Sequence, residues 1–363
     1  MGLFGKRPEL KKLLAQLEEE PVGPNRLSLL ERAIAETARL NDEETGFDLR
    51  ENLLLSSVMI GRLDRCIPAV EWCLARCDAR PDHFDVQRIL FQYKWVVEEL
   101  PRHSEFSRDT IADGIQDLES RFLTAGWGPR GPMLLRMLTS LIMADVDAAK
   151  DAHEKWVSLP RDRGSDCQAC EVGHEVRYRL AIDDDQGAIE AAAPLLEGTL
   201  KCEEEPALTL SRVPIAYFET DQPDLAIDHM KKALELCLEG HQFCEARARL
   251  MQALLLSGNV GPAAQLLEVS LPQALLGGND LSILQTCAIA VPIIDICLRR
   301  NMDLPAFHGL PASVPSDSNS IRNWFVQKND QLAAAFDSRN GNTFYTDFWS
   351  GSQQIAEHYP DEE

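Results

Sequence analysis

Apolar residues recur at spacings of three and four along most of this chain, which is the pattern of amphipathic helices. Clear examples are the runs Leu27-Leu30-Ile34-Ala38 and Leu225-Ile227-Met230-Leu234-Leu238. No Asn-Gly turn joins two alternating apolar and polar runs, so no β-hairpin is predicted. The pair Asn340-Gly341 follows a helical run, and we expect it to end that helix in a left-handed conformation. The pattern predicts an all-α fold.

A short turn recurs between the helical runs and indicates internal repeats. Each copy starts at a small or acidic residue and ends five positions later at an Ala or Cys. The copies are Gly61–Cys66, Ala144–Ala149, Asp183–Ala188, Asp221–Ala226 and Gly258–Ala263. From Ala149 onward their last residues lie 39, 38 and 37 positions apart, and the 83 positions after Cys66 hold two further units. A small residue there lets two antiparallel helices approach closely, and each pair must bury its open face on the next. We therefore expect a right-handed α-solenoid of antiparallel helical hairpins.

These repeats resemble the tetratricopeptide repeat, a helix–turn–helix unit of about 34 residues. The resemblance rests on Asp221–Ala233 and Gly258–Ala263. The units here are a few residues longer, and Pro194 and Pro214 fall inside expected helices, so the repeats are degenerate. The family implies a concave groove, lined by the first helix of each pair, in which partners dock as extended peptides or helices.

Three further segments resemble a bacterial family of tetratricopeptide-like proteins with an Asp-Cys-x-Ala-Cys motif. They are Asp166–Cys170, Asp64–Ala75 with Tyr93–Val96, and Phe336–Asn342. That family has no assigned reaction, so this resemblance implies a fold and a bacterial source.

Two breaks divide the chain. Gly126–Pro132 is rich in Gly and Pro, and Pro305–Ser320 is rich in Pro and Ser and is expected to be an exposed linker. The helix after the linker is expected to cover the last repeat, with Trp324 and Phe325 as anchors. The expected parts are N-terminal helical repeats (1–125), tetratricopeptide-like repeats (132–304), the linker (305–320), a capping helix (321–342) and an acidic tail (343–363).

The charge balance limits the class of partner. The 363 residues include 36 Lys and Arg against 58 Asp and Glu, a net charge of -22. Because nucleic acids and anionic membranes are bound by clustered Lys and Arg, neither is expected as a partner. The ten Cys mostly stand singly in apolar helical patterns, as reduced thiols do, and no uninterrupted apolar run reaches about 18 residues. We expect a cytoplasmic protein.

A Cys-x-x-Cys pair is the sharpest candidate for a metal site. Cys167 and Cys170 are followed by His174 and, further along, by Cys202, which precedes a new helix and can turn back toward them. Four sulfur and nitrogen ligands suit a structural zinc ion. The alternative is that these cysteines pack at helix ends or stay free. Three other cysteines share one helical face and are expected to pack in the core: Cys66, Cys73 and Cys77.

Aligning the repeats on their small residues places a set of hydrogen-bond donors on the groove side. These residues are His174, Arg177, Arg212, Arg249 and Gln252. Their positions resemble those at which related arrays hold a partner's carboxylates, and forked guanidinium groups suit that role. A basic stripe in an acidic protein would attract an acidic peptide. The alternative is that these arginines pair with neighbouring Glu and Asp.

No enzymatic motif accompanies these features. The chain has no Gly-x-Ser-x-Gly, no phosphate-binding Gly-x-x-x-x-Gly-Lys-Ser/Thr and no His-Glu-x-x-His. We therefore expect a non-enzymatic scaffold that binds a protein or peptide in its groove. The alternative is a metal- or thiol-sensing regulator built on Cys167, Cys170, His174 and Cys202. A third possibility is an enzymatic activity without a recognised motif, and a fourth makes the acidic C-terminus itself the ligand of another protein.

Overall fold

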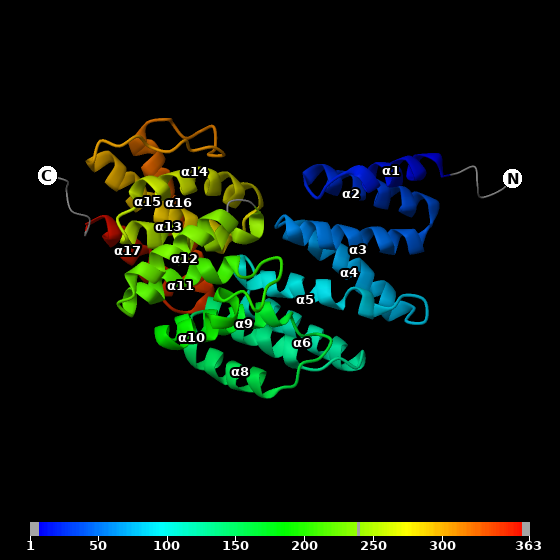
Figure 1. The fold of residues 1–363 in the computed structure, drawn as a ribbon. Coiled ribbons are helices and arrows are strands. Elements are labelled where there is room, and N and C mark those ends of the chain that lie inside the picture. The colour runs from blue at the N-terminus through cyan, green and yellow to red at the C-terminus, as the bar shows by residue number, and fades with distance from the viewer. Residues whose placement is uncertain (1–6, 238–239, 358–363) are drawn as a thin grey trace.

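The computed structural model describes residues 7–237 and 240–357, and every regular element within them is helical. The 17 α-helices of this part confirm the all-α prediction (Figure 1). The first six are α1 (Pro8–Glu19), α2 (Pro24–Leu40), α3 (Glu43–Met59), α4 (Leu63–Ala79), α5 (Leu90–Glu99) and α6 (Arg108–Thr124). The others are α7 (Arg130–Ile142), α8 (Val146–Ser158), α9 (Gln168–Ala181), α10 (Asp185–Leu196), α11 (Ala207–Glu219), α12 (Pro223–Leu236), α13 (Cys244–Leu256), α14 (Val260–Gly277), α15 (Asp280–Arg299), α16 (Ser318–Asn340) and α17 (Phe344–Glu357).

The five recurring turns share one backbone geometry. Each begins with a residue at positive φ, and these residues are Gly61 (69°), Ala144 (56°), Asp183 (59°), Asp221 (57°) and Gly258 (84°). The next amide then reaches back to the last turn of the helix, as when Asp145 N donates to Ser140 O at 2.9 Å. These bonds satisfy carbonyl groups that a helix end otherwise leaves without partners. The repeated sequence pattern is therefore a repeated helix stop.

The small residue that closes each turn is fully enclosed. Its exposed fraction is at most 1% in all five copies: Cys66, Ala149, Ala188, Ala226 and Ala263. A larger side chain at this place would push the two helices of a pair apart, because protein interiors leave no spare volume. Burial of the small residue at each of these five positions is consistent with a close approach of the two helices.

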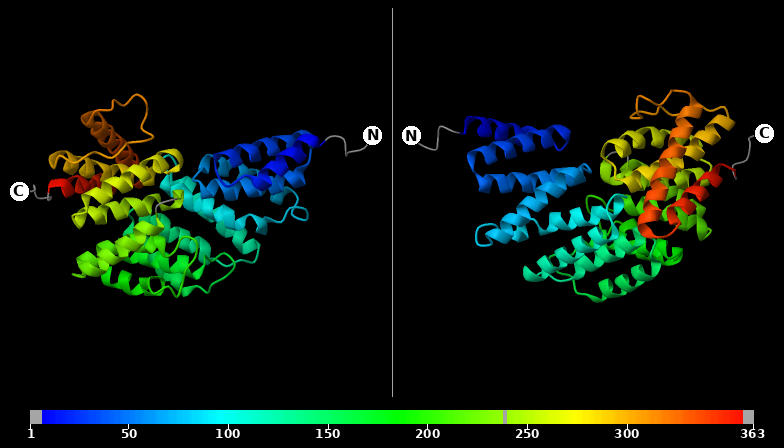
Figure 2. Two further views of the ribbon diagram at one scale, coloured as in Figure 1. Left: turned by 45° about the horizontal axis from the view of Figure 1, so that its top comes forward. Right: turned by 180° about the vertical axis from the view of Figure 1, so that it is seen from behind.

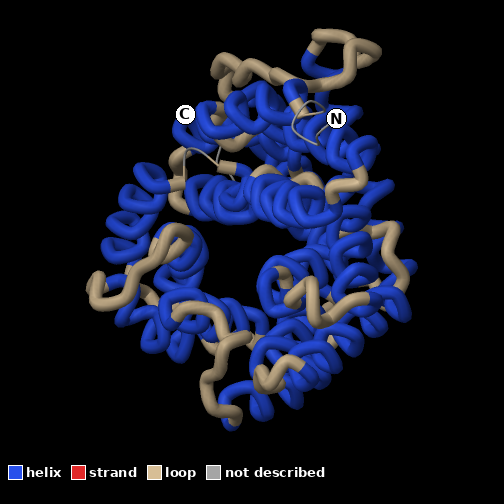
Figure 3. The backbone as a smooth tube through the Cα atoms, turned by 90° about the vertical axis from the view of Figure 1, so that its right-hand side faces the viewer, coloured by secondary structure: helices blue, strands red, loops and turns tan. Residues whose placement is uncertain are grey.

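The odd-numbered helices pack against one another in chain order. α3 contacts α5, α5 contacts α7, and the series continues through α9, α11 and α13 to α15. The even-numbered helices α8, α10, α12 and α14 each pack on the preceding odd helix. Figure 3 shows helices disposed in a ring when the molecule is viewed from the side, and α1–α4 extend from the rest in Figures 1 and 2. The odd helices therefore form one continuous row.

The Pro- and Ser-rich segment before α16 forms no helix but packs on the core. Most of its residues are exposed, and Figure 2 shows it looping along the outside of the C-terminal helices. Phe307 lies against Phe325 with ring centroids 5.6 Å apart, and Ala306 N donates to a carboxylate oxygen of Glu268 at 3.3 Å. Phe325 is fully buried and Trp324 is partly buried where α16 covers α15.

A further helix stands where an acidic tail was expected. α17 packs against α15 and α16, and its buried face consists of Tyr345, Trp349, Ser352 and Ala356. These four follow the three- and four-residue spacing of an amphipathic helix, a pattern that the acidic end of the chain obscured. Asp361, Glu362 and Glu363 lie outside the described residues.

The C-terminal helices dock on the middle of the chain. Arg339 donates to the carbonyl oxygens of Pro101 (2.8 Å) and His103 (2.9 Å), and the Tyr345 hydroxyl donates to Ile142 O at 2.7 Å. At the first residue of α15, the Asp280 carboxylate accepts from the Ser104 amide (2.9 Å) and hydroxyl (2.7 Å). These contacts join residues about 200 positions apart.

α15 is the core helix of this half. It has the length and hydropathy of a membrane-crossing helix, yet 78% of its most apolar window is buried inside the protein. It packs against α13, α14, α16 and α17, which accounts for its apolar composition.

Replacing Asp337 tests the docking of α17. Its carboxylate accepts from the amides of Tyr345 (2.9 Å) and Thr346 (2.9 Å) and from the Thr346 hydroxyl (2.6 Å). Asp337→Ala leaves these amides at the start of α17 without their acceptor, so we expect a loss of about 2–3 kcal/mol in the free energy of unfolding, measured with urea. Asp347→Ala, an exposed acid of the same helix, should cost less than about 1 kcal/mol. Equal losses would contradict this role of Asp337.

Candidate functional site

The three arginines predicted to face the groove lie close enough for their positive charges to repel one another. Arg177 lies on α9, Arg212 on α11 and Arg249 on α13, successive helices of the odd row. Burial, followed by the positive charges of Arg102, Arg212 and Arg249, lowers the pKa of Arg177 to about 10. The fourth arginine, Arg102, comes from the short helix η3 (Leu100–Arg102), which the C-terminal helices contact. We call these four side chains the arginine cluster.

Two members of the arginine cluster make no direct ion pair, although the charge of Glu245 acts on both at longer range. Among residues 7–237 and 240–357, neither Arg177 nor Arg249 makes a hydrogen bond or an ion pair with another described residue. Arg249 is exposed to water and Arg177 is half-buried. Arg212 makes one long contact, 3.9 Å from its Nη1 to Glu205 Oε1. Like charges gathered without partners cost free energy, and an incoming anion relieves that cost.

Carboxylates reach one side of the cluster. Glu245 Oε1 lies 3.5 Å from Arg102 Nε, and Glu99 Oε2 lies 3.3 Å from the same nitrogen. Burial raises the pKa of Glu245, but Arg102, Arg177, Arg212 and Arg249 outweigh it and hold this pKa at about 2. Glu99 behaves in the opposite way, because burial outweighs Arg102 and raises its pKa to about 7. Glu245 is therefore ionised at neutral pH, whereas Glu99 is close to half-protonated.

The other two predicted groove residues differ in their surroundings. Gln252 is half-buried on α13, three positions after Arg249. His174 is three positions before Arg177 on α9, but its Nε2 lies 3.5 Å from the Asp166 carboxylate. The imidazole thus belongs to a separate polar network.

That network fixes the segment that leads into α9. Lys94 has no exposed surface, and its ammonium group lies 2.6 Å from Asp166 Oδ1. Burial raises the pKa of Asp166, but the charge of Lys94 and the hydrogen bond with His174 outweigh it and lower this pKa below its usual value. A buried ammonium group needs such a partner, because an unpaired charge in the interior is very costly.

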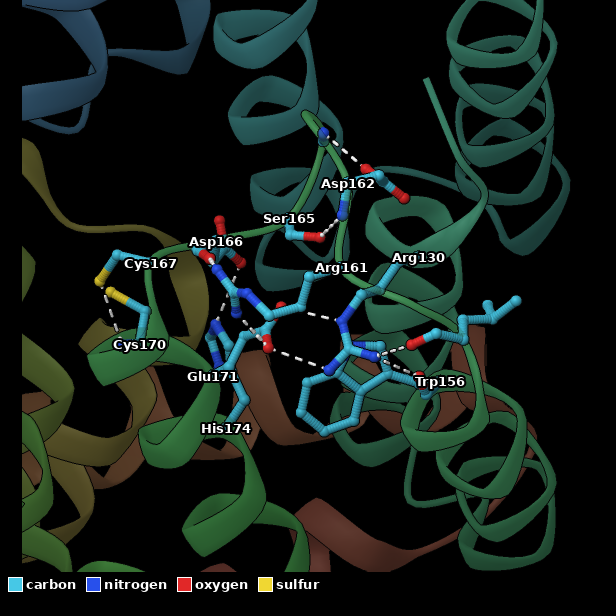
Figure 4. Close-up of polar contacts among 12 residues, drawn as sticks. Arg130, Trp156, Arg161, Asp162, Ser165, Asp166, Cys167, Cys170, Glu171 and His174 are labelled. Atoms are coloured by element: carbon cyan, nitrogen blue, oxygen red, sulfur yellow. Dashed lines mark hydrogen bonds and ion pairs between the residues drawn. The ribbon is translucent and has the colours of Figure 1, made fainter. Parts of the chain in front are cut away.

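A second buried pair lies beside the first (Figure 4). Arg130 makes two parallel hydrogen bonds to the Glu171 carboxylate, at 3.0 and 2.9 Å, and also donates to Trp156 O at 2.8 Å. Arg161 bonds the same carboxylate at 2.5 Å. Together these contacts hold the first turn of α9 against α7 and α8, and so set the position from which Arg177 projects.

Three of the four predicted metal ligands come together. The ligand atoms of Cys167, Cys170 and Cys202 all lie within 4.8 Å of one another, an arrangement able to hold a metal ion. His174 is not part of this group, because its ring nitrogen faces Asp166 and the buried Lys94 keeps that carboxylate ionised. The predicted ligand set is therefore corrected to three thiols. Cys66, Cys73 and Cys77 are buried in the core, as predicted.

The residues that sequence reasoning missed are those supplied from a distance. Arg102, Glu99 and Glu245 complete the arginine cluster, and Lys94 stands 72 positions from its partner Asp166. No local pattern marks Arg102 as different from other arginines beside acidic residues.

Comparison with known proteins identifies no relative of this chain. No protein-family model matches the chain, and no curated protein matches it significantly.

The raised pKa of Glu99 predicts a pH-dependent effect of Glu99→Gln. Because the folded protein holds this proton more tightly than the unfolded chain does, Glu99 costs stability progressively as pH rises from 4.5 through about 7. Gln stays neutral at every pH. The free energy of unfolding of Glu99→Gln, relative to that of wild type, should therefore rise by roughly 2 kcal/mol from pH 5 to pH 8. This value allows for the partial exposure of the Glu99 side chain. Urea unfolding of both proteins at the two pH values measures this change. A difference independent of pH would contradict the assignment.

Proposed function

We propose that this chain is a right-handed α-solenoid of degenerate tetratricopeptide-like helical hairpins. Support comes from the helix stop that recurs every 37 to 39 residues from Ala144 onward and from the fully buried small residue that follows each stop. The continuous row of odd helices is the arrangement in which successive hairpins bury one another's open faces.

We further propose that the protein is a non-enzymatic scaffold whose groove binds an acidic peptide or helix. The observation that carries this proposal is that neither Arg177 nor Arg249 makes a direct ion pair among the described residues, while the one carboxylate whose charge reaches both, Glu245, lies beside Arg102. In a chain with 58 acidic residues, exposed arginines normally find partners, as Arg65 does with Glu31. Four arginines share the charge of Glu245, and two of them make no direct contact with a carboxylate, so a partner's carboxylates would complete the site.

The geometry of the cluster indicates the class of ligand. Arg177, Arg212 and Arg249 stand on consecutive helices of the odd row, so an extended segment crossing that row meets one guanidinium group per repeat. Each group offers a planar fork of donors that matches a carboxylate. The net charge of -22 elsewhere repels a polyanion such as nucleic acid, so a peptide with a few carboxylates is the better fit.

The setting fits a reducing bacterial cytoplasm. All ten cysteines are free, which agrees with a compartment where thiols stay reduced. A second candidate function, metal or thiol sensing, is favoured by the three clustered thiols Cys167, Cys170 and Cys202.

Titration with a Glu-rich peptide of about 12 residues tests the groove. Wild type is expected to bind it with an affinity that falls as salt rises. The double variant Arg177→Gln/Arg249→Gln should bind at least about tenfold more weakly, since each charge-assisted hydrogen bond is worth about 1.5–3 kcal/mol. Isothermal titration calorimetry measures both.

Lys150→Gln is the matched control, because Lys150 is an exposed cation on α8 outside the odd row. It should bind the peptide as wild type does. An equal loss of peptide affinity in the control and in the double variant would indicate non-specific electrostatic attraction. Unchanged peptide affinity in the double variant would show that the arginine cluster is not the binding site.

A further inference from the structure

The three clustered thiols differ from the other cysteines of the chain. Seven cysteines are buried inside the helical core, whereas Cys170 and Cys202 are half-buried and Cys167 is exposed. These three stand at the start of α9 and in the turn before α11, not in the middle of a helix. Their placement is not that of apolar packing residues, for which burial is the rule.

The sulfur atoms are spaced as metal ligands are. Cys170 Sγ lies 3.5 Å from Cys202 Sγ, and all three sulfurs fall within 4.8 Å of one another. Zinc–sulfur bonds of about 2.3 Å in a tetrahedral arrangement place neighbouring sulfurs roughly 3.8 Å apart. One ion among these three atoms therefore needs shifts of about an ångström or less.

Backbone amides donate hydrogen bonds to two of the three sulfur atoms. The Cys170 amide donates to Cys167 Sγ at 3.3 Å, and the Glu205 amide donates to Cys202 Sγ at 3.3 Å. Cys167 also occupies the N-cap of α9, where the helix dipole favours negative charge. In both segments a cysteine sulfur thus accepts a hydrogen bond from the amide three residues later. The two segments face each other through Cys170 and Cys202, which are 32 positions apart.

We propose that Cys167, Cys170 and Cys202 bind one thiophilic divalent cation, of which Zn²⁺ is the representative, with solvent at the fourth coordination position. His174 is held at Asp166 and does not supply that fourth ligand. The ion joins the N-terminus of α9 to the turn before α11, and so stabilises the spacing between two helices of the odd row. The proposal does not depend on peptide binding.

Metal content of the full chain, purified without an affinity tag under reducing conditions, tests this site. Wild type is expected to hold about one Zn²⁺ per chain after gel filtration in zinc-containing buffer. Cys202→Ala should bind Zn²⁺ at least about 100-fold more weakly, since even outer-shell substitutions cost about 10- to 100-fold. Cys297→Ala, which removes a buried thiol from α15, is the matched control and should bind as wild type.

Two further measurements on wild type test the site even if Cys202→Ala fails to fold. Co²⁺ added to wild type should give the charge-transfer absorption of thiolate ligands, and chelation should lower the Tm of wild type. If Cys202→Ala does fold, chelation should leave its Tm unchanged. Absence of metal from reduced wild type, or equal zinc affinity in both variants, would overturn the proposal. So would a Cys170–Cys202 disulfide found by mass spectrometry in place of bound metal.

Discussion

The docking of the C-terminal helices on residues 99–108 is the contact on which the candidate site depends. Arg339 bonds the carbonyl groups on either side of Arg102, and Asp280 bonds Ser104. These bonds close the row of helices and hold Arg102 beside arginines that come from α9, α11 and α13. Without this docking, the cluster would contain only the arginines of α9, α11 and α13. Glu99 and Glu245 would then not lie beside the same guanidinium group, that of Arg102.

Buried ion pairs give the site its rigid frame. Lys94–Asp166 and Arg130–Glu171 fix the segment before α9, and in both of these pairs the cation has a carboxylate at hydrogen-bond distance. The arginine cluster follows the opposite rule, because Arg177 and Arg249 have no such partner in the part of the chain that the structure describes. This contrast within one protein is the physical basis for our proposal that the first set supports the fold and the second binds a partner.

The sequence predicts what depends on local pattern. The helix stops at Ala144, Asp183 and Asp221 and the buried alanines after them follow from residue type and spacing, and the repeat alignment places three arginines on successive helices of the odd row. Contacts over about 200 residues have no such signal, so Arg102 was missed. The spacing after Cys170 made His174 a candidate metal ligand, and no local pattern shows that it lies beside Asp166, whose other partner Lys94 is 72 positions away. α17 was missed because its acidic surroundings obscured a short apolar stripe.

The central claim is that the arginine cluster is a carboxylate-binding site, and the guanidinium groups themselves report on it. The most direct measurement is an NMR titration that follows the arginine side-chain Nε–H signals, assigned by substitution, while a Glu-rich peptide is added. The account predicts that the signals of Arg177 and Arg249 shift first and saturate together, whereas those of arginines already paired on the surface, such as Arg65, stay in place. Shifts confined to surface arginines, or no shift at Arg177 and Arg249, would contradict it.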